Sequence, residues 1–567
     1  MGKNNGEKKE KKKISSKLKV VCIVLVCIVV FCGIAAMIGL NKSNAKSAGG
    51  DAYSDEVRLL SDDVVGDVEV STLPLKNGTL LQRGAYLFSG KVIYMVRTGT
   101  ATEYYVCNDN GTESIRICTV EGRVGSRILP FTDNRRVLLG DCVLECPEGQ
   151  TLDNCKEDAA QIVPINIPKE FSSDSAVMDE WTEVIIAPDN KHFAWTIRRS
   201  DCGAVNAMGE LVRGDTAYEV ENAKYISNMN TLEGDSSDYT CNPIIGGEVK
   251  QFVHGGEAIS LVGSAQNGMG DSVVQDVATG EVTEITHAPG YDETTIFSPD
   301  EKLGMVMTSR FSEASDLGML GMMDRPYGQV LHNLMGHIYM YSVTGVRSGR
   351  EGNVGPALID IEKSMEDEDY MGLDLSDPNE EWIFNSPMSW NEDGTQAMWM
   401  EREKNRNHIR LQIATLKDYQ PDDVVEAINT PEVGDYATEP GEDMDYDGII
   451  NGKESGYVEV YKKTGFFNIT TVTFTYHDYS DDGETFYNGT ESSKSSMFTK
   501  TTYTSDLKVT DEDGDEVGAM DVELVFGAAY KISSAISDAV NPALDLNKSH
   551  GVVSWEGKSA DISTLVE

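Results

Sequence analysis

The chain has 567 residues, with 93 acidic and 48 basic side chains, and a formal net charge of −45 at pH 7. Such an excess of carboxylates repels the phosphates of nucleic acids, so we expect no nucleic-acid partner. The length is sufficient for more than one domain.

An uncharged segment near the N-terminus, residues 20–40, predicts one transmembrane helix. A helix of that length rises about 30 Å, which matches the hydrocarbon core of a bilayer. Eight lysines precede it, and an excess of lysine marks the cytoplasmic side of a membrane. We therefore expect a single-pass protein of the cell membrane, with its N-terminus in the cytoplasm and its bulk outside. A cleaved signal peptide is the alternative, although its apolar region is usually shorter.

The part beyond residue 42 carries 39 basic and 91 acidic side chains, a balance that suits a soluble domain facing outward. It also holds seven cysteines, an odd number, so at least one is unpaired or pairs outside the chain. Two interpretations stay open, a disulfide framework and buried free thiols. The cysteines are Cys107, Cys118, Cys142, Cys146, Cys155, Cys202 and Cys241.

An internal repeat dominates the middle of the chain. Residues 129–139, 185–195, 296–306 and 388–399 each contain an apolar run, a turn with Pro or Asp, and a second apolar run. Weaker copies occur at 87–94 and 253–260. Pro fixes φ at the first turn position and Asp caps the turn with its side chain, so each copy predicts a β-hairpin. Further strands are expected at 102–107, 272–277 and 337–342.

These turns resemble the Phe-Ser-Pro-Asp-Gly-Lys repeat of TolB-like β-propeller proteins. The match is close at 297–302 and 187–191, fair at 389–394 and poor at 253–257. The resemblance covers roughly residues 85–430 and implies a six-bladed β-propeller in a membrane-anchored bacterial surface protein. It implies no activity, because propellers host binding, scaffolding and catalysis alike. A pair of β-sandwiches is the structural alternative, but six copies of one turn type favour the propeller.

An acidic loop follows the repeats and fits the EF-hand pattern position for position. We expect it to bind Ca²⁺ through three carboxylates, one backbone carbonyl and one bidentate carboxylate. No amphipathic helix flanks the loop, so an acidic turn between domains is the alternative. The expected ligands are Asp443, Asp445, Asp447, Ile449 and Glu454.

Residues 456–535 alternate apolar and polar side chains in runs that predict strands at 458–461, 468–476, 485–488, 498–509 and 517–526. The acidic segment 511–515 reads as a hairpin tip. We therefore predict a separate antiparallel β domain here.

The predicted fold class is all-β: a six-bladed β-propeller and a C-terminal antiparallel β domain, preceded by one transmembrane helix. The expected divisions are a cytoplasmic basic tail at 1–19, the transmembrane helix at 20–40, a spacer at 41–80, the propeller at 81–430, a linker with the acidic loop at 431–455, and the C-terminal domain at 456–567.

No catalytic motif for nucleophilic hydrolysis or for a zinc protease occurs in the sequence. Some TolB-like propellers are polysaccharide lyases that hold a metal with histidines, so a carbohydrate-active enzyme is the alternative function. The histidines to follow are His254, His332, His337 and His408, although their spacing matches no lyase. Five tryptophans are candidates for a carbohydrate platform, whereas core packing is the stronger reading at repeat positions such as Trp195 and Trp399. The five are Trp181, Trp195, Trp382, Trp390 and Trp399.

The leading hypothesis is a non-enzymatic surface module that binds an extracellular or periplasmic protein, peptide or glycan. The long segments at 308–336 and 345–386 are the expected binding loops, because long loops in compact domains are often functional.

Overall fold

The structure is a computed structural model of the chain. It describes residues 57–564, except 77–78, 123, 126, 174–176, 200–202, 228, 232–238, 242–246, 264–269, 288–290, 312–321, 327–353, 368, 379–381, 404–407, 440–447, 465–468, 496–498 and 529–543. The predicted tail and transmembrane segment, residues 1–40, lie outside this part. Among the described residues, no helix is both long and apolar enough to cross a bilayer.

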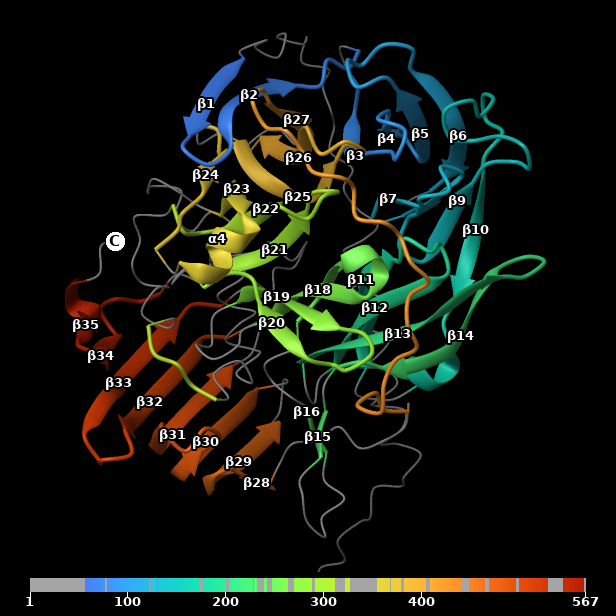
Figure 1. Ribbon diagram of the computed structural model, residues 1–567. Coiled ribbons are helices and arrows are strands. Elements are labelled where there is room, and N and C mark those ends of the chain that lie inside the picture. Colours follow the sequence, from blue (N-terminus) through green and yellow to red (C-terminus); the bar gives the residue numbers. More distant parts are fainter. Residues whose placement is uncertain are drawn as a thin grey trace, which may run out of the picture.

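Residues 58–416 form a series of mainly antiparallel sheets, and in most of them neighbouring strands are consecutive in sequence (Figure 1). One sheet contains β3 (Leu81–Tyr86), β4 (Val92–Thr98), β5 (Ala101–Cys107) and β6 (Ile115–Glu121). The next is eight-stranded, and β10 and β14 pair in parallel at its centre. Its strands are β7 (Leu129–Pro130), β8 (Arg136–Leu138), β9 (Cys142–Glu145), β10 (Gln161–Asn166), β11 (Val177–Ile186), β12 (His192–Arg199), β13 (Gly203–Arg213) and β14 (Tyr218–Tyr225).

Two further four-stranded sheets follow. The first contains β17 (Val249–Val253), β18 (Ala258–Gly263), β19 (Asp271–Asp276) and β20 (Val282–Glu284), and the second β21 (Asp292–Phe297), β22 (Leu303–Thr308), β23 (Gly355–Asp360) and β24 (Leu373–Asp374). A small hairpin, β15 (Met229–Thr231) and β16 (Tyr239–Cys241), lies between β14 and β17 in the chain. The short helices of this part are η1 (Lys169–Phe171), η3 (His254–Gly256) and α4 (Ile361–Glu366).

The last sheet of the series joins strands from both ends of the repeat region. β25 (Trp382–Trp390), β26 (Gln396–Glu403) and β27 (Ile409–Leu416) are extended by β2 (Gly66–Thr72) and β1 (Arg58–Asp62). β2 pairs with β27 from Val68↔Leu416 to Thr72↔Gln412. Strands from the segment expected to be a spacer are therefore part of this sheet.

All six predicted hairpins are present, as β3–β4, β7–β8, β11–β12, β17–β18, β21–β22 and β25–β26. In most of their turns a residue near the apex has a positive φ, for example 62° at Asn190 and 72° at Gly394. Gly and Asn tolerate this conformation, which explains why they recur there. The expected strands at 102–107 and 272–277 are β5 and β19, whereas 337–342 lies outside the described residues.

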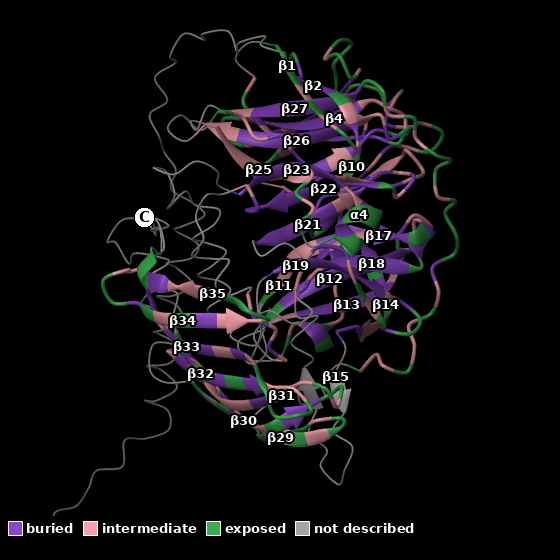
Figure 2. Cartoon of the chain, turned by 60° about the vertical axis from the view of Figure 1, so that its left-hand side comes forward, coloured by how far each residue is buried: buried purple, intermediate pink, exposed green. Residues whose placement is uncertain are grey.

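The apolar cores lie between the faces of successive sheets, which are arranged around a common centre in Figure 1. Ile185 of β11 shares one cluster with Phe252 of β17. Another cluster places Tyr94 of β4 with Met400 of β26, so the last sheet packs against the first. Burial of both faces explains the nearly continuous purple of these strands in Figure 2 and the apolar runs of the repeat. Trp195 and Trp399 are fully buried, as expected.

The C-terminal region forms a separate eight-stranded antiparallel sheet, β28 to β35, with its strands in chain order. Alternation along β32 buries Tyr503, Leu507 and Val509 on one face and exposes Thr504, Asp506 and Lys508 on the other, so one face is mainly apolar and the other faces solvent. The predicted strands and the hairpin tip at 511–515 are confirmed. The bounds are β28 (Gly448–Asn451), β29 (Ser455–Thr464), β30 (Thr470–Ser480), β31 (Phe486–Ser495), β32 (Thr501–Thr510), β33 (Glu516–Phe526), β34 (His550–Trp555) and β35 (Lys558–Asp561), followed by η6 (Ile562–Thr564).

The long segment between β22 and β23 reaches this second sheet. Arg325 is buried there, with its Nε 3.4 Å from a carboxylate oxygen of Glu491 on β31. The hydroxyls of Tyr476 and Tyr503 donate to the same carboxylate at 2.8 and 2.9 Å. Met323 belongs to the apolar cluster of that face. The described part of the expected binding loop 308–336 therefore includes residues that anchor the C-terminal sheet.

The second expected loop, 345–386, also contains regular structure. Its described residues form β23, α4, β24 and the start of β25, and they complete two sheets. Apolar side chains of β23, such as Leu358 and Ile359, are fully buried, which explains why this segment forms strands.

Five of the seven cysteines beyond residue 42 are buried free thiols: Cys107, Cys118, Cys142, Cys146 and Cys155. Burial raises the pKa of Cys107 to about 12 and that of Cys118 to about 11. These two thiols are therefore protonated and unreactive at neutral pH. The structure describes neither Cys202 nor the side chain of Cys241.

The buried pair of Arg325 and Glu491 gives a prediction. Arg325→Met leaves the buried carboxylate of Glu491 without its cation, and the free energy of unfolding should fall by about 3–5 kcal/mol. Urea unfolding of the C-terminal sheet, followed by circular dichroism, measures the change. Lys508→Met is the control, because Lys508 pairs with Glu516 on the same sheet in an exposed position and should matter by less than about 1 kcal/mol. Equal effects of the two substitutions would contradict this account.

Candidate functional site

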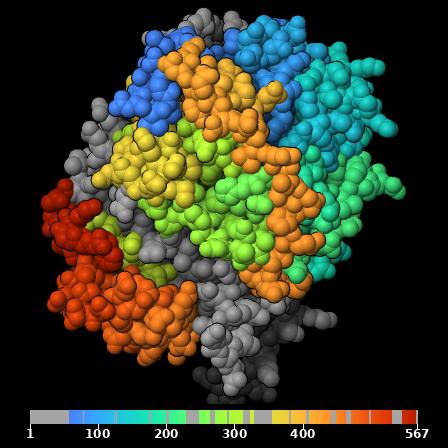
Figure 3. Space-filling view, in the orientation of Figure 1, coloured from blue at the N-terminus to red at the C-terminus, as the bar shows by residue number. Residues whose placement is uncertain are grey.

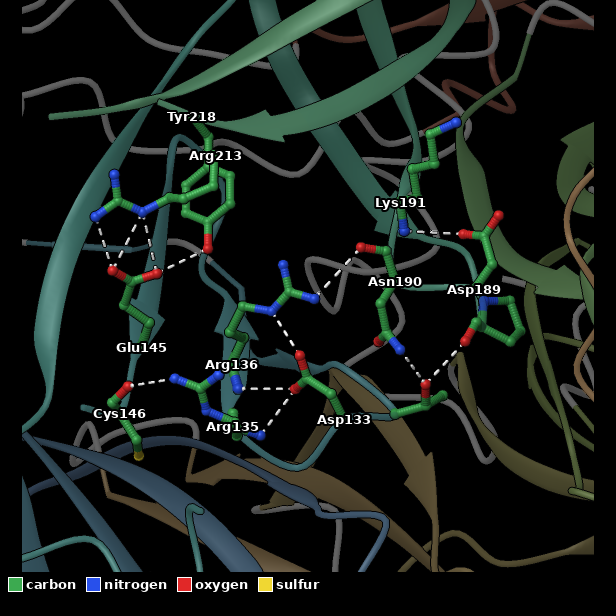
Figure 4. Close-up of polar contacts among 12 residues, drawn as sticks. Asp133, Arg135, Arg136, Glu145, Cys146, Asp189, Asn190, Lys191, Arg213 and Tyr218 are labelled. Carbon is green, nitrogen blue, oxygen red and sulfur yellow. Dashed lines mark hydrogen bonds and ion pairs between the residues drawn. The ribbon is translucent and has the colours of Figure 1, made fainter. Parts of the chain in front are cut away.

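The turns of the repeated hairpins gather on one face, here called the turn face. Figure 4 shows two successive turns linked by polar contacts. Asn190 donates to the hydroxyl of Thr132 at 2.6 Å, and that hydroxyl donates to the carbonyl of Pro188 at 2.8 Å. Farther along the ring, the backbone N–H of His254 donates to Glu301 at 2.6 Å. Neighbouring sheets are thus locked together at their turns.

The repeated aspartate has two functions in these turns. One oxygen of Asp189 accepts the N–H groups of Lys191 and His192, which closes the turn. Its other oxygen contacts the His192 ring at 2.5 Å and accepts the N–H of Thr430 at 3.2 Å. Burial would raise the pKa of this carboxyl, but the bonds to His192 and Lys191 outweigh it and hold the pKa well below the usual range.

Asp300 repeats this arrangement in another sheet. One oxygen accepts the Ser298 hydroxyl at 2.5 Å and the Lys302 N–H at 3.3 Å. The second accepts the Tyr419 hydroxyl at 2.7 Å and the Asp422 N–H at 3.1 Å. The aspartate therefore connects its own turn to a segment more than a hundred residues away.

That segment is residues 417–438, here called the strap. It leaves β27 and crosses the turn face, where it is the orange band in front of the sheets in Figure 3. Its backbone N–H groups at Val425 and Ile428 donate to the carbonyls of Pro299 and Gly255. It ends in a reciprocal pair of hydrogen bonds between Thr438 and Tyr225. The strap thus contacts turns of three sheets in succession.

Gly255 allows the strap to approach closely. Its φ is 67°, and a Cβ placed there would collide with the carbonyl oxygen of Glu426. A side chain at this position would therefore push the strap away from the turn.

A charged cluster connects the first strands of three sheets. Lys250 of β17 lies 2.9 Å from Glu248, 3.3 Å from Glu293 of β21 and 3.6 Å from Glu183 of β11. Arg127 adds a second cation, 2.5 Å from Glu183. Three carboxylates against two cations leave this group with a formal charge of −1.

Burial and charge act in opposite directions within this cluster. Burial disfavours the ammonium of Lys250, but Glu248, Glu183 and Glu293 outweigh it and raise the pKa of Lys250. Burial raises the pKa of Glu293; Lys250 opposes the rise, and Glu248 and Glu183 add to it. The lysine is therefore held charged, and the cluster ties three sheets together.

The opposite face, here called the insertion face, follows from the topology. A first strand such as β11 ends at the turn face, so in an antiparallel sheet the connection between the second and third strands lies at the other end. The ends of the second strands and the starts of the third strands therefore lie at the insertion face, as do the starts of the first strands.

A hollow of about 510 Å³ is lined by residues of β10, the segment that leads into η1, β11 and the start of β14. Its apolar lining comes from Ile165, Ile167, Pro168 and the indole of Trp181. The Trp181 ring also packs edge-on against Phe193, with centroids 6.0 Å apart. The indole is thus held in place while it remains only partly buried.

The polar lining of this hollow contains two acidic residues, one basic residue and two neutral residues. Asn166, Lys169, Ser172, Glu180 and Glu219 contribute to it. Asn166 donates to Glu219 at 2.8 Å. Glu180 makes no hydrogen bond or ion pair with the other described residues. One cation and two carboxylates give the lining a formal charge of −1.

The predicted calcium loop is only partly described. Asp443, Asp445 and Asp447 lie outside the described residues. Ile449 is exposed on β28 and pairs with Glu459, whereas the N–H of Glu454 donates to the Ser480 carbonyl. The second half of the loop is thus a strand and turn at the edge of the C-terminal sheet. No group of three potential metal-binding side chains occurs among the residues that the structure describes.

The histidines considered for a metal site are also partly described. His254 contacts Glu301 at 2.7 Å, and His408 contacts Glu403 at 3.2 Å. The two histidines thus lie in different sheets, and each has its own carboxylate partner. His332 and His337 lie outside the described residues.

Sequence reasoning missed the charged cluster, the strap and most of the hollow. A lone charge within an apolar strand, such as Lys250 in Val249–Val253, was a usable signal for the cluster. The hollow gave none, because its lining comes from four separate elements. Of the residues that line it, only Trp181 is among the five tryptophans predicted as candidates for a carbohydrate platform.

Comparison with known proteins identifies no family. No protein-family model matches the chain, and no curated protein matches it. Solved structures match at low similarity. A TolB-type protein from Agrobacterium tumefaciens is 9% identical, and the match covers 63% of this chain and 85% of that protein, with a TM-score of 0.29. TolB from Acinetobacter baumannii is 13% identical, and the match covers 58% of this chain and 64% of that protein, also with a TM-score of 0.29. An oligogalacturonate lyase in complex with manganese is 10% identical, covers 64% of this chain and 96% of its own, and has a TM-score of 0.31. Such low values transfer no activity.

The strap contacts give the next prediction. Asp300→Asn replaces a carboxylate oxygen that accepts two hydrogen bonds from the strap, so strap amides such as Asp422 and Val425 should exchange hydrogen about tenfold faster. Hydrogen exchange followed by mass spectrometry measures this rate. Asp393→Asn is the matched control, because Asp393 caps its own turn through Thr395. If both variants leave strap exchange unchanged, the aspartate does not hold the strap.

Proposed function

We propose that this protein is a six-bladed β-propeller held at the outer side of a membrane, where it binds a protein, peptide or glycan through its insertion face. Six hairpins of one type and the pairing of β2 with β27 support a ring closed by strands from both of its ends. The observation that carries the choice of face is the strap. It occupies the turn face with hydrogen bonds to Asp189 and Asp300, which leaves the insertion face for a partner.

The anchor is part of this proposal. Residues 20–40 would cross the membrane once, with the lysines of 1–19 in the cytoplasm. The net charge of the outer part suits an outward-facing module that is repelled by anionic lipid. Protease added to intact cells should degrade the sheets and spare the N-terminal tail; full protection of the sheets would contradict this topology.

Binding at the insertion face is testable with the full-length chain in lipid nanodiscs. Arrays of short peptides and of oligosaccharides supply ligands, and hydrogen exchange then locates the bound ligand. We expect slower exchange at the starts of β11 and β13 and at β27's first residues, with turns 187–192 and 297–302 unchanged. Slower exchange confined to those turns would contradict the proposal.

The alternative, a surface enzyme acting on polysaccharide, makes a different prediction in the same preparation. A lyase would generate unsaturated products that absorb ultraviolet light when an acidic polysaccharide is added. Sustained turnover of this kind would replace the binding-module interpretation.

We further propose that the acidic loop binds Ca²⁺ through Asp443, Asp445, Asp447, the Ile449 carbonyl and Glu454. Burial of Ile450 in the apolar face of the C-terminal sheet supports it, because an EF-hand-type loop needs an apolar anchor at this position.

Calcium titration of the full-length chain tests the site. Millimolar Ca²⁺ should raise the melting temperature of the C-terminal sheet by a few degrees, since a ligand that binds only the folded state stabilises it. Asp445→Asn combined with Asp447→Asn should abolish the rise, and Asp511→Asn with Asp513→Asn, in the other acidic turn, should leave it intact. A rise that survives loss of Asp445 and Asp447 would exclude this loop.

A further inference from the structure

The hollow beside Trp181 has a composition that selects among the ligand classes considered above. It offers an aromatic face, two carboxylates and one cation on a largely preformed surface. Ile165 and Glu219 are placed by the parallel pairing of β10 with β14, and Trp181 by its contact with Phe193. A site built on strands in this way keeps its shape when empty.

From this composition we propose that the hollow binds a lysine or arginine side chain of an extended peptide segment in a partner protein. This inference rests on the proposed function and specifies its ligand. A cation over an indole is attracted by the negative face of the ring. A carboxylate beside the ring supplies a charge-assisted hydrogen bond to the same cation. Trp181 and Glu180 are consecutive in β11, and both line the hollow.

The charge of the lining supports a cation over a neutral sugar. Glu180 has no partner among the described residues, and Glu219 is engaged only by the neutral amide of Asn166. An unpaired carboxylate at a ligand site is best satisfied by a positive group, because a hydroxyl leaves its charge uncompensated. The whole outer part carries a large negative charge, which also steers basic partners towards it.

The size of the hollow limits the ligand. A volume of about 510 Å³ accommodates one long side chain and the flanking backbone, but not a folded domain. Lys169 at the same site can pair with a backbone carbonyl or an acidic neighbour in the peptide. We therefore expect recognition of one basic residue within an extended segment.

Fluorescence anisotropy with the full-length chain in nanodiscs tests the proposal. The probe is a fluorescein-labelled peptide, Gly-Ser-Gly-Arg-Gly-Ser-Gly, compared with the same peptide carrying citrulline, the uncharged isostere of arginine. The arginine peptide should bind at least about fivefold more tightly than the citrulline peptide. Raising the salt concentration should weaken the binding, because part of the attraction is between exposed charges.

Substitutions in the hollow locate the binding. Glu180→Gln and Trp181→Phe should each weaken binding of the arginine peptide by at least about threefold. Glu281→Gln is the control for loss of one negative charge, because Glu281 is exposed in another sheet. Trp181→Phe keeps an aromatic contact with Phe193, and Glu180→Gln leaves that contact unchanged, so neither variant should unfold the protein. Thermal melting of each variant then distinguishes a loss of binding from a loss of folding.

Three outcomes would overturn the proposal. Equal binding of the arginine and citrulline peptides would show that the hollow does not recognise a positive charge. Equal effects of Glu180→Gln and Glu281→Gln would show that the peptide does not bind in the hollow. Binding of a neutral oligosaccharide that depends on Trp181 would show that the hollow is a glycan site. The proposed function as a binding module would then stand, but this inference would fail. Failure of the broader function would instead appear as ligand protection at the turn face.

Discussion

The hydrogen bonds between the strap and the turn aspartates determine how the rest of this molecule can be used. Asp189 and Asp300 each close a turn with one oxygen and hold the strap with the other. The aspartate that recurs in the repeat therefore also holds the strap over one face of the sheets. The turns that the strap covers are therefore not free for a partner. A local turn contact that recurs in the repeat thus also fixes a distant segment of the chain.

Electrostatics supports the same division of the molecule. The charged residues at the centre neutralise one another almost completely, since Lys250 and Arg127 face Glu183, Glu248 and Glu293. Such a satisfied cluster fixes the positions of strands and leaves little charge for a ligand. In the hollow beside Trp181, by contrast, Glu180 has no counterion among the described residues. The acidic charge available for recognition therefore lies in the hollow rather than in the central cluster.

The sequence predicted the hairpins well because their signal is local. Pro and Asp at fixed offsets determine each turn, and alternating apolar residues determine the strands on either side, so even the poor copy at 253–260 folds as expected. The C-terminal strands were predicted for the same reason. The pairing of β2 with β27 and the burial of Arg325 against Glu491 were not predictable, because each joins segments far apart in the chain.

The candidate site was less accessible to sequence reasoning. Trp181 was one of five tryptophans considered for ligand contact, but Asn166, Lys169 and Glu219 become neighbours only when β10 pairs in parallel with β14. The acidic loop is the opposite case, because its spacing is a strong signal within one short segment of the sequence. Binding of Ca²⁺ by this loop remains a prediction.

Carboxyl footprinting of the full-length chain tests the central claim most directly. A carbodiimide couples exposed carboxylates to an amine, and mass spectrometry then gives the rate at each residue. If the strap closes the turn face and the hollow is open, Glu180 and Glu219 should react much faster than Asp189 and Asp300. Equal rates at the four positions, or faster labelling of the turn aspartates, would contradict the account.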